Sequence, residues 1–152
     1  MVYVLFSIYT FFIKTFFLNF FYEENKKELY DALFSLTQGL IQDYPGYQNW
    51  FYGTFIEGLK KHERIYLVAQ EGNQIVGCTF LKNTPDEKKI SSLYVVPTSR
   101  KKGIGHLLME KSVKLLGTGT IVSVSDQNLS GLSFLLKKWE KMPAVWQKPF
   151  WD

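Results

Sequence analysis

The stretch from residue 99 to residue 108, SRKKGIGHLL, restricts the possible folds of this chain more than any other feature. It follows an apolar run, residues 90–96, that ends at Pro97, and it opens a helical pattern that continues to about Leu116. The pattern predicts a strand, a short turn and a helix in direct succession. At such a junction the helix N-terminus presents backbone N–H groups without intrahelical acceptors and a partial positive charge.

The turn itself carries both positive charge and glycine. Arg100, Lys101 and Lys102 precede Gly103 and Gly105, and we call residues 100–106 the basic turn. Glycine leaves no side chain to keep an anion away from the backbone, and the three cations add attraction at its edge. We therefore expect a diphosphate to bind here.

Two well-known phosphate loops do not fit the spacing of the basic turn. The dinucleotide fingerprint needs a third glycine where this chain has Leu108. The loop of nucleoside-triphosphate enzymes needs Lys and Ser or Thr after its second glycine, where this chain has His106 and Leu107.

The basic turn resembles the acyl-coenzyme-A-binding motif of the GNAT superfamily of N-acetyltransferases, which reads Arg/Gln-x-x-Gly-x-Gly/Ala. Arg100, Gly103 and Gly105 stand at its defined positions, after a strand end at residues 93–97 that is typical of that family. The resemblance extends more weakly over residues 20–139. It implies an α+β fold, a mixed and mostly antiparallel sheet flanked by helices, here with a short C-terminal end. It also implies transfer of an acetyl group from acetyl-CoA to a primary amine.

The resemblance also assigns the cofactor contacts, residue by residue. Main-chain groups of Leu93 and Val95 would contact the pantetheine arm and the acyl carbonyl. The basic turn would bind the pyrophosphate, and Asn128 would contact the cofactor from the other side. The implied cofactor-binding residues are Leu93, Val95, Arg100, Lys101, Lys102, Gly103, Ile104, Gly105, His106 and Asn128.

The groups that would move protons depart from the family pattern. Leu135 stands where many members carry a tyrosine acid, Ser123 where some carry a glutamate base, and Ser91 and Ser92 where the central strand often has a carboxylate. Tyr94 is the remaining candidate catalytic residue, as a proton donor to sulfur, although a tyrosine at this place can equally belong to the core. These departures motivate an alternative function, a catalytically degenerate acyl-CoA-binding module or sensor. A third, weaker hypothesis is a membrane-tethered interaction protein.

Residues 1–22 are apolar and aromatic, with Lys14 as their single charge. Their β-branched and aromatic content favours a strand of the sheet. A membrane-associating helix and a disordered start remain alternatives, and the first would place Lys14 inside the bilayer at a cost of roughly 2.5 to 3.5 kcal/mol. Residues 23–152 would then form the N-acetyltransferase domain.

Hydrophobic periodicity and turn residues predict the other elements. Apolar residues at helical spacing indicate two helices before the hairpin, and Cys78 lies in the second hairpin strand as a buried thiol. The predicted segments are helices at 23–40, 50–62 and 129–139, and strands at 65–70, 75–81, 90–96, 121–125 and 144–148.

The amino-acid composition limits the kinds of binding partner that this protein can have. A net charge of +4 over 152 residues, without a basic stripe, argues against nucleic-acid binding. One cysteine excludes an internal disulfide, and no His, Cys and carboxylate cluster has metal spacing. We expect a cytoplasmic enzyme without a metal, whose acceptor is a small-molecule or peptide amine. The short C-terminal end leaves part of the sheet surface bare, and we expect either a second subunit of a homodimer or residues 1–22 to cover it.

Overall fold

A computed structural model describes residues 14–19, 27–124 and 146–149 of the chain. A six-stranded sheet at its centre has the strands in chain order. The strands are β1 (Lys14–Asn19), β2 (Arg64–Glu71), β3 (Gln74–Asn83), β4 (Lys88–Val95), β5 (Ile121–Val124) and β6 (Trp146–Pro149). β1 to β4 pair antiparallel, and β4, β5 and β6 pair parallel, so the predicted mixed and mostly antiparallel sheet is confirmed.

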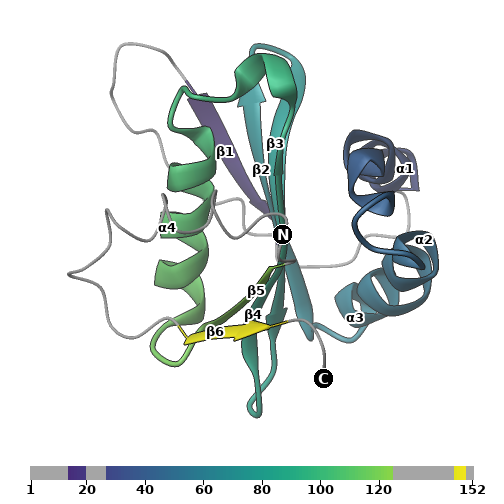
Figure 1. Ribbon diagram of the computed structural model, residues 1–152, viewed down its shortest axis with the longest axis vertical. Helices are drawn as coiled ribbons and strands as arrows, with labels where there is room; N and C mark the ends of the chain where they lie inside the picture. The colour runs from purple at the N-terminus through teal and green to yellow at the C-terminus, as the bar shows by residue number, and fades with distance from the viewer. Residues whose placement is uncertain (1–13, 20–26, 125–145, 150–152) are drawn as a thin grey trace.

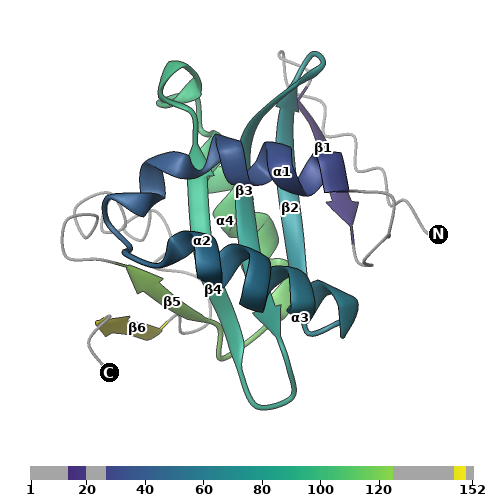
Figure 2. The ribbon, with the colours of Figure 1, turned by 90° about the vertical axis from the view of Figure 1, so that its right-hand side faces the viewer.

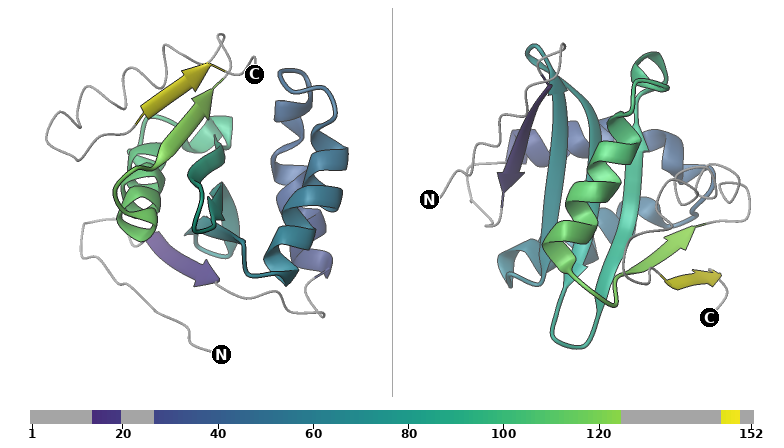
Figure 3. Two further views of the ribbon diagram at one scale, coloured as in Figure 1. Left: turned by 90° about the horizontal axis from the view of Figure 1, so that it is seen from below. Right: turned by 90° about the vertical axis from the view of Figure 1, so that its left-hand side faces the viewer.

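Helices cover both faces of the sheet (Figure 1). On one face lies α4 (Ile104–Leu116), which follows the basic turn. On the other face lie α1 (Lys27–Leu36) and a continuous helical segment made of α2 (Tyr47–Asn49), a π-helical stretch (Trp50–Phe55) and α3 (Ile56–Lys60). Figure 2 shows these helices crossing in front of the strands, and Figure 3 shows the sheet between the two helical layers.

The first helix is shorter than its apolar spacing predicts. It ends at Leu36, and Gln38–Ile41 forms a separate 3-10 turn. At this helix end lies Thr37, whose fully buried hydroxyl donates to the carbonyl oxygen of Leu33 at 2.8 Å and accepts from the Tyr47 hydroxyl at 2.8 Å. A side-chain bond to the preceding helical turn favours an end at this position.

Each face of the sheet has its own core. Under α4, buried aliphatic side chains such as Leu67, Val95 and Leu108 pack together. Under α1 to α3 the core is aromatic, and Phe80 of β3 lies there with its ring centroid 4.4 Å from that of Phe55. Because the two cores hold the sheet from both sides, its strand ends are fixed in place for a site.

Cys78 of β3 is 1% exposed within the aromatic core, which confirms the predicted buried thiol. Burial raises the pKa of this thiol, because the charged thiolate would lose its hydration. We therefore assign Cys78 a packing role.

The two ends of the chain add the outer strands. β1 pairs with β2 from Lys14↔Glu71 to Asn19↔Tyr66, and β6 lies parallel to β5. Residues 1–13 and 20–22 of the apolar segment, the predicted helix at 129–139 and Asn128 lie outside the described residues. Among the helices in the described ranges, none is long and apolar enough to cross a membrane.

Candidate active site

The basic turn joins the end of β4 to the start of α4. After a 3-10 turn at Pro97–Ser99, the backbone takes positive φ angles at Lys101 (60°) and Gly103 (81°), and α4 begins at Ile104. The carbonyl oxygen of Gly103 accepts the first helical bond, from the N–H of Leu107 at 3.0 Å. Among the described residues, no side chain caps this helix start. The first-turn N–H groups, which have no intrahelical acceptor, are therefore suited to hold an anion.

The two glycines of the basic turn have different surroundings. A Cβ added at Gly103 would meet no described atom within 4 Å, and its φ of +81° is one that side chains rarely adopt. A Cβ added at Gly105 would face the sheet instead, 3.7 Å from Val95 Cγ2 and 3.8 Å from Leu93 Cδ2. Gly103 thus leaves open space beside the helix start, whereas Gly105 lets α4 approach β4.

The side chains of the basic turn do not converge on one point. The Arg100 Nε donates to the carbonyl oxygen of Val95 at 2.9 Å, so this side chain turns back along β4. Lys102 Nζ lies 3.5 Å from Glu71 Oε2, and Lys101 is exposed. The side chain of Ile104 is 1% exposed in the aliphatic core, which leaves only its backbone for a ligand. The charge available to an anion is therefore smaller than the sequence alone indicates.

β4 and β5 separate soon after they meet. Their parallel pairing is limited to Lys89↔Ile121 and Ile90↔Val122. On its other side β4 stays paired with β3 up to Gly77↔Val95, with an irregularity at Phe80/Leu81 that leaves Ser91 as an extra residue. Among the described residues, the backbone of β4 beyond Ile90 is therefore paired on one side only.

Leu93 and Val95 lie on this half-paired part of β4. The N–H of Val96 donates to the carbonyl oxygen of Val76 in β3 at 2.9 Å. Because backbone groups alternate along an antiparallel strand, those of Leu93 and Val95 point away from β3, toward the separation from β5. The bond from Arg100 to the Val95 oxygen agrees with this direction.

Tyr94 points to the opposite face from Leu93 and Val95. It packs, half-buried, against the aromatic core, and its hydroxyl would lie 3.4 Å from a Cβ added at Gly39. The guanidinium carbon of Arg100 lies 5.7 Å from the centre of the Tyr94 ring. The end of β4 thus brings together Tyr94, Val95 and Arg100.

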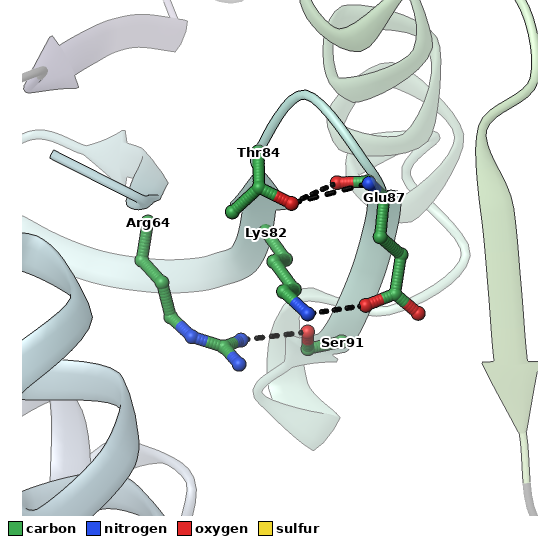
Figure 4. A network of polar contacts seen from close by, with 5 residues as sticks. All are labelled: Arg64, Lys82, Thr84, Glu87 and Ser91. Atoms are coloured by element: carbon green, nitrogen blue, oxygen red, sulfur yellow. Dashed lines mark hydrogen bonds and ion pairs between the residues drawn. The ribbon is translucent and has the colours of Figure 1, made fainter.

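Sequence reasoning missed Arg64, the first residue of β2. Its Nη1 donates to Ser91 Oγ at 3.1 Å (Figure 4). Its guanidinium carbon lies 5.5 Å from the centre of the Trp50 ring. Burial lowers the pKa of this guanidinium, and the nearby carboxylates of Glu87 and Glu63 oppose the shift. No motif marks Arg64, because its neighbours in the site come from distant parts of the sequence.

Gly58 makes room for Arg64. A Cβ added at Gly58 would lie 2.5 Å from Arg64 Cγ and 2.8 Å from Cδ. We expect Gly58→Ala to displace Arg64 and to lower the free energy of unfolding by about 1 to 3 kcal/mol. Gly53→Ala, at an exposed helical position with nothing within 4 Å of the new atom, should raise it by about 0.5 to 1 kcal/mol. Urea denaturation of both variants tests this, and equal shifts would contradict the steric role of Gly58.

Comparison with protein families agrees with this geometry. The family described as "Acetyltransferase (GNAT) domain" matches residues 62–137, which span the hairpin, β4, the basic turn and α4. The chain belongs to the GNAT acetyltransferase family. A comparison with curated protein sequences gave no match.

Several solved structures share the fold of this GNAT domain. A predicted acetyltransferase from Clostridium acetobutylicum, crystallised with acetyl-CoA, has a TM-score of 0.59 at 15% identity over 86% of this chain and 91% of that one. An aminoglycoside acetyltransferase from an uncultured soil metagenomic sample, in complex with sisomicin, has a TM-score of 0.62 at 16% identity over 91% and 94%. A PaiA N-acetyltransferase from Thermoplasma acidophilum, in complex with coenzyme A, has a TM-score of 0.56 at 18% identity over 81% and 87%. At these identities the likeness is one of fold.

Proposed function

We propose that this GNAT protein transfers an acetyl group from acetyl-CoA to a primary amine. The observation that carries the proposal is the half-paired end of β4, which leads directly into the basic turn. One segment of chain thereby offers backbone groups for an extended, amide-containing arm and a helix N-terminus for a diphosphate. Family membership and neighbours crystallised with acetyl-CoA or coenzyme A support the same ligand.

In the proposed reaction an unprotonated amine attacks the thioester carbonyl carbon, and the bond to sulfur breaks. Negative charge develops on the carbonyl oxygen, where a fixed backbone N–H of β4 would stabilise it. Leu93 is our candidate, because its backbone groups point into the separation between β4 and β5 and it lies nearer than Val95 to the point where the two strands part. The amine must lose a proton and the thiolate gains one.

Tyr94 is the residue we propose to protonate the sulfur. It comes from the same strand as Val95, and its half-buried side chain lies on the face covered by α1 to α3. A thiolate with an ordinary pKa of about 8.5 leaves readily, so Tyr94→Phe should lower kcat by only about 10- to 100-fold. Single-turnover kinetics with a reactive amine measures this, and unchanged turnover would remove Tyr94 from the mechanism.

Two measurements test the proposed function. Calorimetry with acetyl-CoA should show binding, and a panel of amines should then release free thiol from the bound thioester. Binding without thiol release for any amine would favour the alternative of an acyl-CoA-binding module. Absence of binding would refute both.

Glu71 should weaken the binding of coenzyme A in this proposal. Its carboxylate Oε2 lies 3.5 Å from Lys102 Nζ and 3.4 Å from Ser99 Oγ, so it places a negative charge beside the basic turn. Glu71→Gln should tighten coenzyme A binding by about 2- to 5-fold at low salt, and by less at high salt. Glu57→Gln, which alters an exposed pair with Lys60 on α3, is the matched control. Equal affinities for the Glu71 variant and the original chain would show that the carboxylate does not reach the ligand.

A further inference from the structure

Arg64 lies beside the point where β4 and β5 separate. The last residue of β4 that pairs with β5 is Ile90, and Ser91, which accepts the hydrogen bond from Arg64, is the next residue. The side chain of Arg64 crosses from β2 to β4 on the face that carries α1 to α3, where Trp50 lies against it. A guanidinium thus stands at the start of the half-paired part of β4.

Within the described residues, no ion pair neutralises the charge of Arg64. Throughout the described part of the chain, no carboxylate lies within 4.0 Å of its guanidinium nitrogens. Glu87, whose negative charge acts on Arg64, is itself paired with Lys82 at 2.5 Å (Figure 4). A guanidinium has five N–H donors, and among the described residues only the Nη1 of Arg64 has a hydrogen-bond acceptor, the neutral Ser91. A half-buried arginine in this state can still bind an anion.

This anion cannot be the pyrophosphate bound by the basic turn. Ser91 and Val95 are four residues apart on β4, which corresponds to about 13 Å, and the basic turn lies beyond Val95. Arg64 and the basic turn therefore serve opposite ends of the half-paired segment. An acceptor that approaches the thioester from the side of α1 to α3 would meet Arg64.

A carboxylate fits these surroundings better than a phosphate. The planar guanidinium, with Trp50 against one face, offers paired N–H groups in the plane of a carboxylate. A phosphate would bring about two negative charges to a single cation, since Lys82 is held by Glu87. We propose that Arg64 binds a carboxylate group of the acceptor, so that the acetylated amine belongs to an amino acid or a similar amino-carboxylic acid. This inference rests on the proposed acetyl transfer.

The experiment compares matched acceptors. Thiol release from acetyl-CoA is measured with the common α-amino acids, with their amides, and with O-phosphoethanolamine. The best amino acid should exceed its amide by about 10- to 100-fold in kcat/KM. The basicity of the amine cannot cause this preference, because the amide has the less basic amine and is the more deprotonated of the two.

Arg64→Gln should then raise KM for the acid by about 10- to 100-fold and leave KM for the amide nearly unchanged. Arg64→Lys should retain part of the preference, because it keeps the charge but loses the planar fork. Lys60→Gln, an exposed charge on α3, is the control and should leave the preference intact. If Arg64 only supported the fold, its replacement would lower turnover of acid and amide alike.

Several results would overturn the inference. One is that amino acids react no better than their amides, or do not react at all. Another is that only O-phosphoethanolamine is preferred as acceptor. A third is that the preference for the amino acid over its amide persists in Arg64→Gln. The comparison of acid with amide uses the original chain, so it stands even where a variant does not fold. Calorimetry with acetyl-CoA distinguishes an error in the acceptor class from an error in the proposed function. Acetyl-CoA would still bind if only the acceptor class were wrong.

Discussion

Gly103→Val is expected to weaken the binding of acetyl-CoA by about 100-fold, a larger effect on ligand binding than the one expected for Glu71→Gln. A Cβ at residue 103 would enter open space beside the first turn of α4, where the proposal places the pyrophosphate. The φ of +81° also forces a β-branched residue into a conformation that costs about 1 to 3 kcal/mol. The turn would then either lose its shape or fill the ligand's position. Calorimetry with acetyl-CoA measures the affinity, and thermal unfolding measures the cost to the fold.

Gly46→Val provides the control for this prediction. Gly46 stands before α2 with φ 87° and ψ 5°, and Gly103 stands before α4 with φ 81° and ψ 4°. In both places an added Cβ meets nothing within 4 Å. The two variants should lose similar stability, and only the change at Gly103 should impair binding. Similar losses of affinity in both would attribute the effect to general destabilisation and would contradict a phosphate site at residue 103.

Phe80→Ala should lower the free energy of unfolding by about 3 to 5 kcal/mol, the largest stability effect that we expect from one substitution. Phe80 is 0% exposed, and its ring lies 4.4 Å from that of Phe55 and 5.6 Å from that of Phe51, measured between centroids. Its removal leaves a cavity between β3 and the helical segment above it. For a domain of this size the loss corresponds to a fall in Tm of roughly 6 to 20 °C.

Ile41→Ala is the comparison for Phe80→Ala. Ile41 is 40% exposed on the 3-10 turn after α1, so its truncation should change stability by less than about 0.5 kcal/mol. Denaturation followed by circular dichroism measures both variants. A small loss for Phe80→Ala would mean that the helices over β3 do not depend on the aromatic core.

Local patterns were sufficient for the central part of the fold. The apolar run before Pro97 and the helical spacing after Gly103 correctly placed β4 and α4, because strand and helix periodicity are properties of neighbouring residues. The hairpin of β2 and β3 followed from the same alternation and from the turn at Gly72. The site residues assigned by the resemblance to GNAT proteins, Asn128 included, stay predictions, and experiments on binding must test them.

Other features depend on contacts between distant residues. At the end of α1 the Tyr47 hydroxyl donates to the Thr37 hydroxyl, and these two residues meet only after the helices have packed. The direction of Arg100, which turns toward the Val95 oxygen, could not be read from a cluster of three basic residues. In both cases a hydrogen bond selected one of several conformations that the local sequence allows.

The order of the elements and the basic turn follow from local sequence, since backbone preference and hydrophobic periodicity act over a few residues. By contrast, the separation of β4 from β5 after Ile90 and the contact of Arg64 with Ser91 beside Trp50 arise only in the packed fold. Strand pairing, and the contacts of the Arg64 guanidinium with Ser91 and Trp50, join segments that lie far apart in the chain. Such contacts exist only once both cores have closed on the sheet.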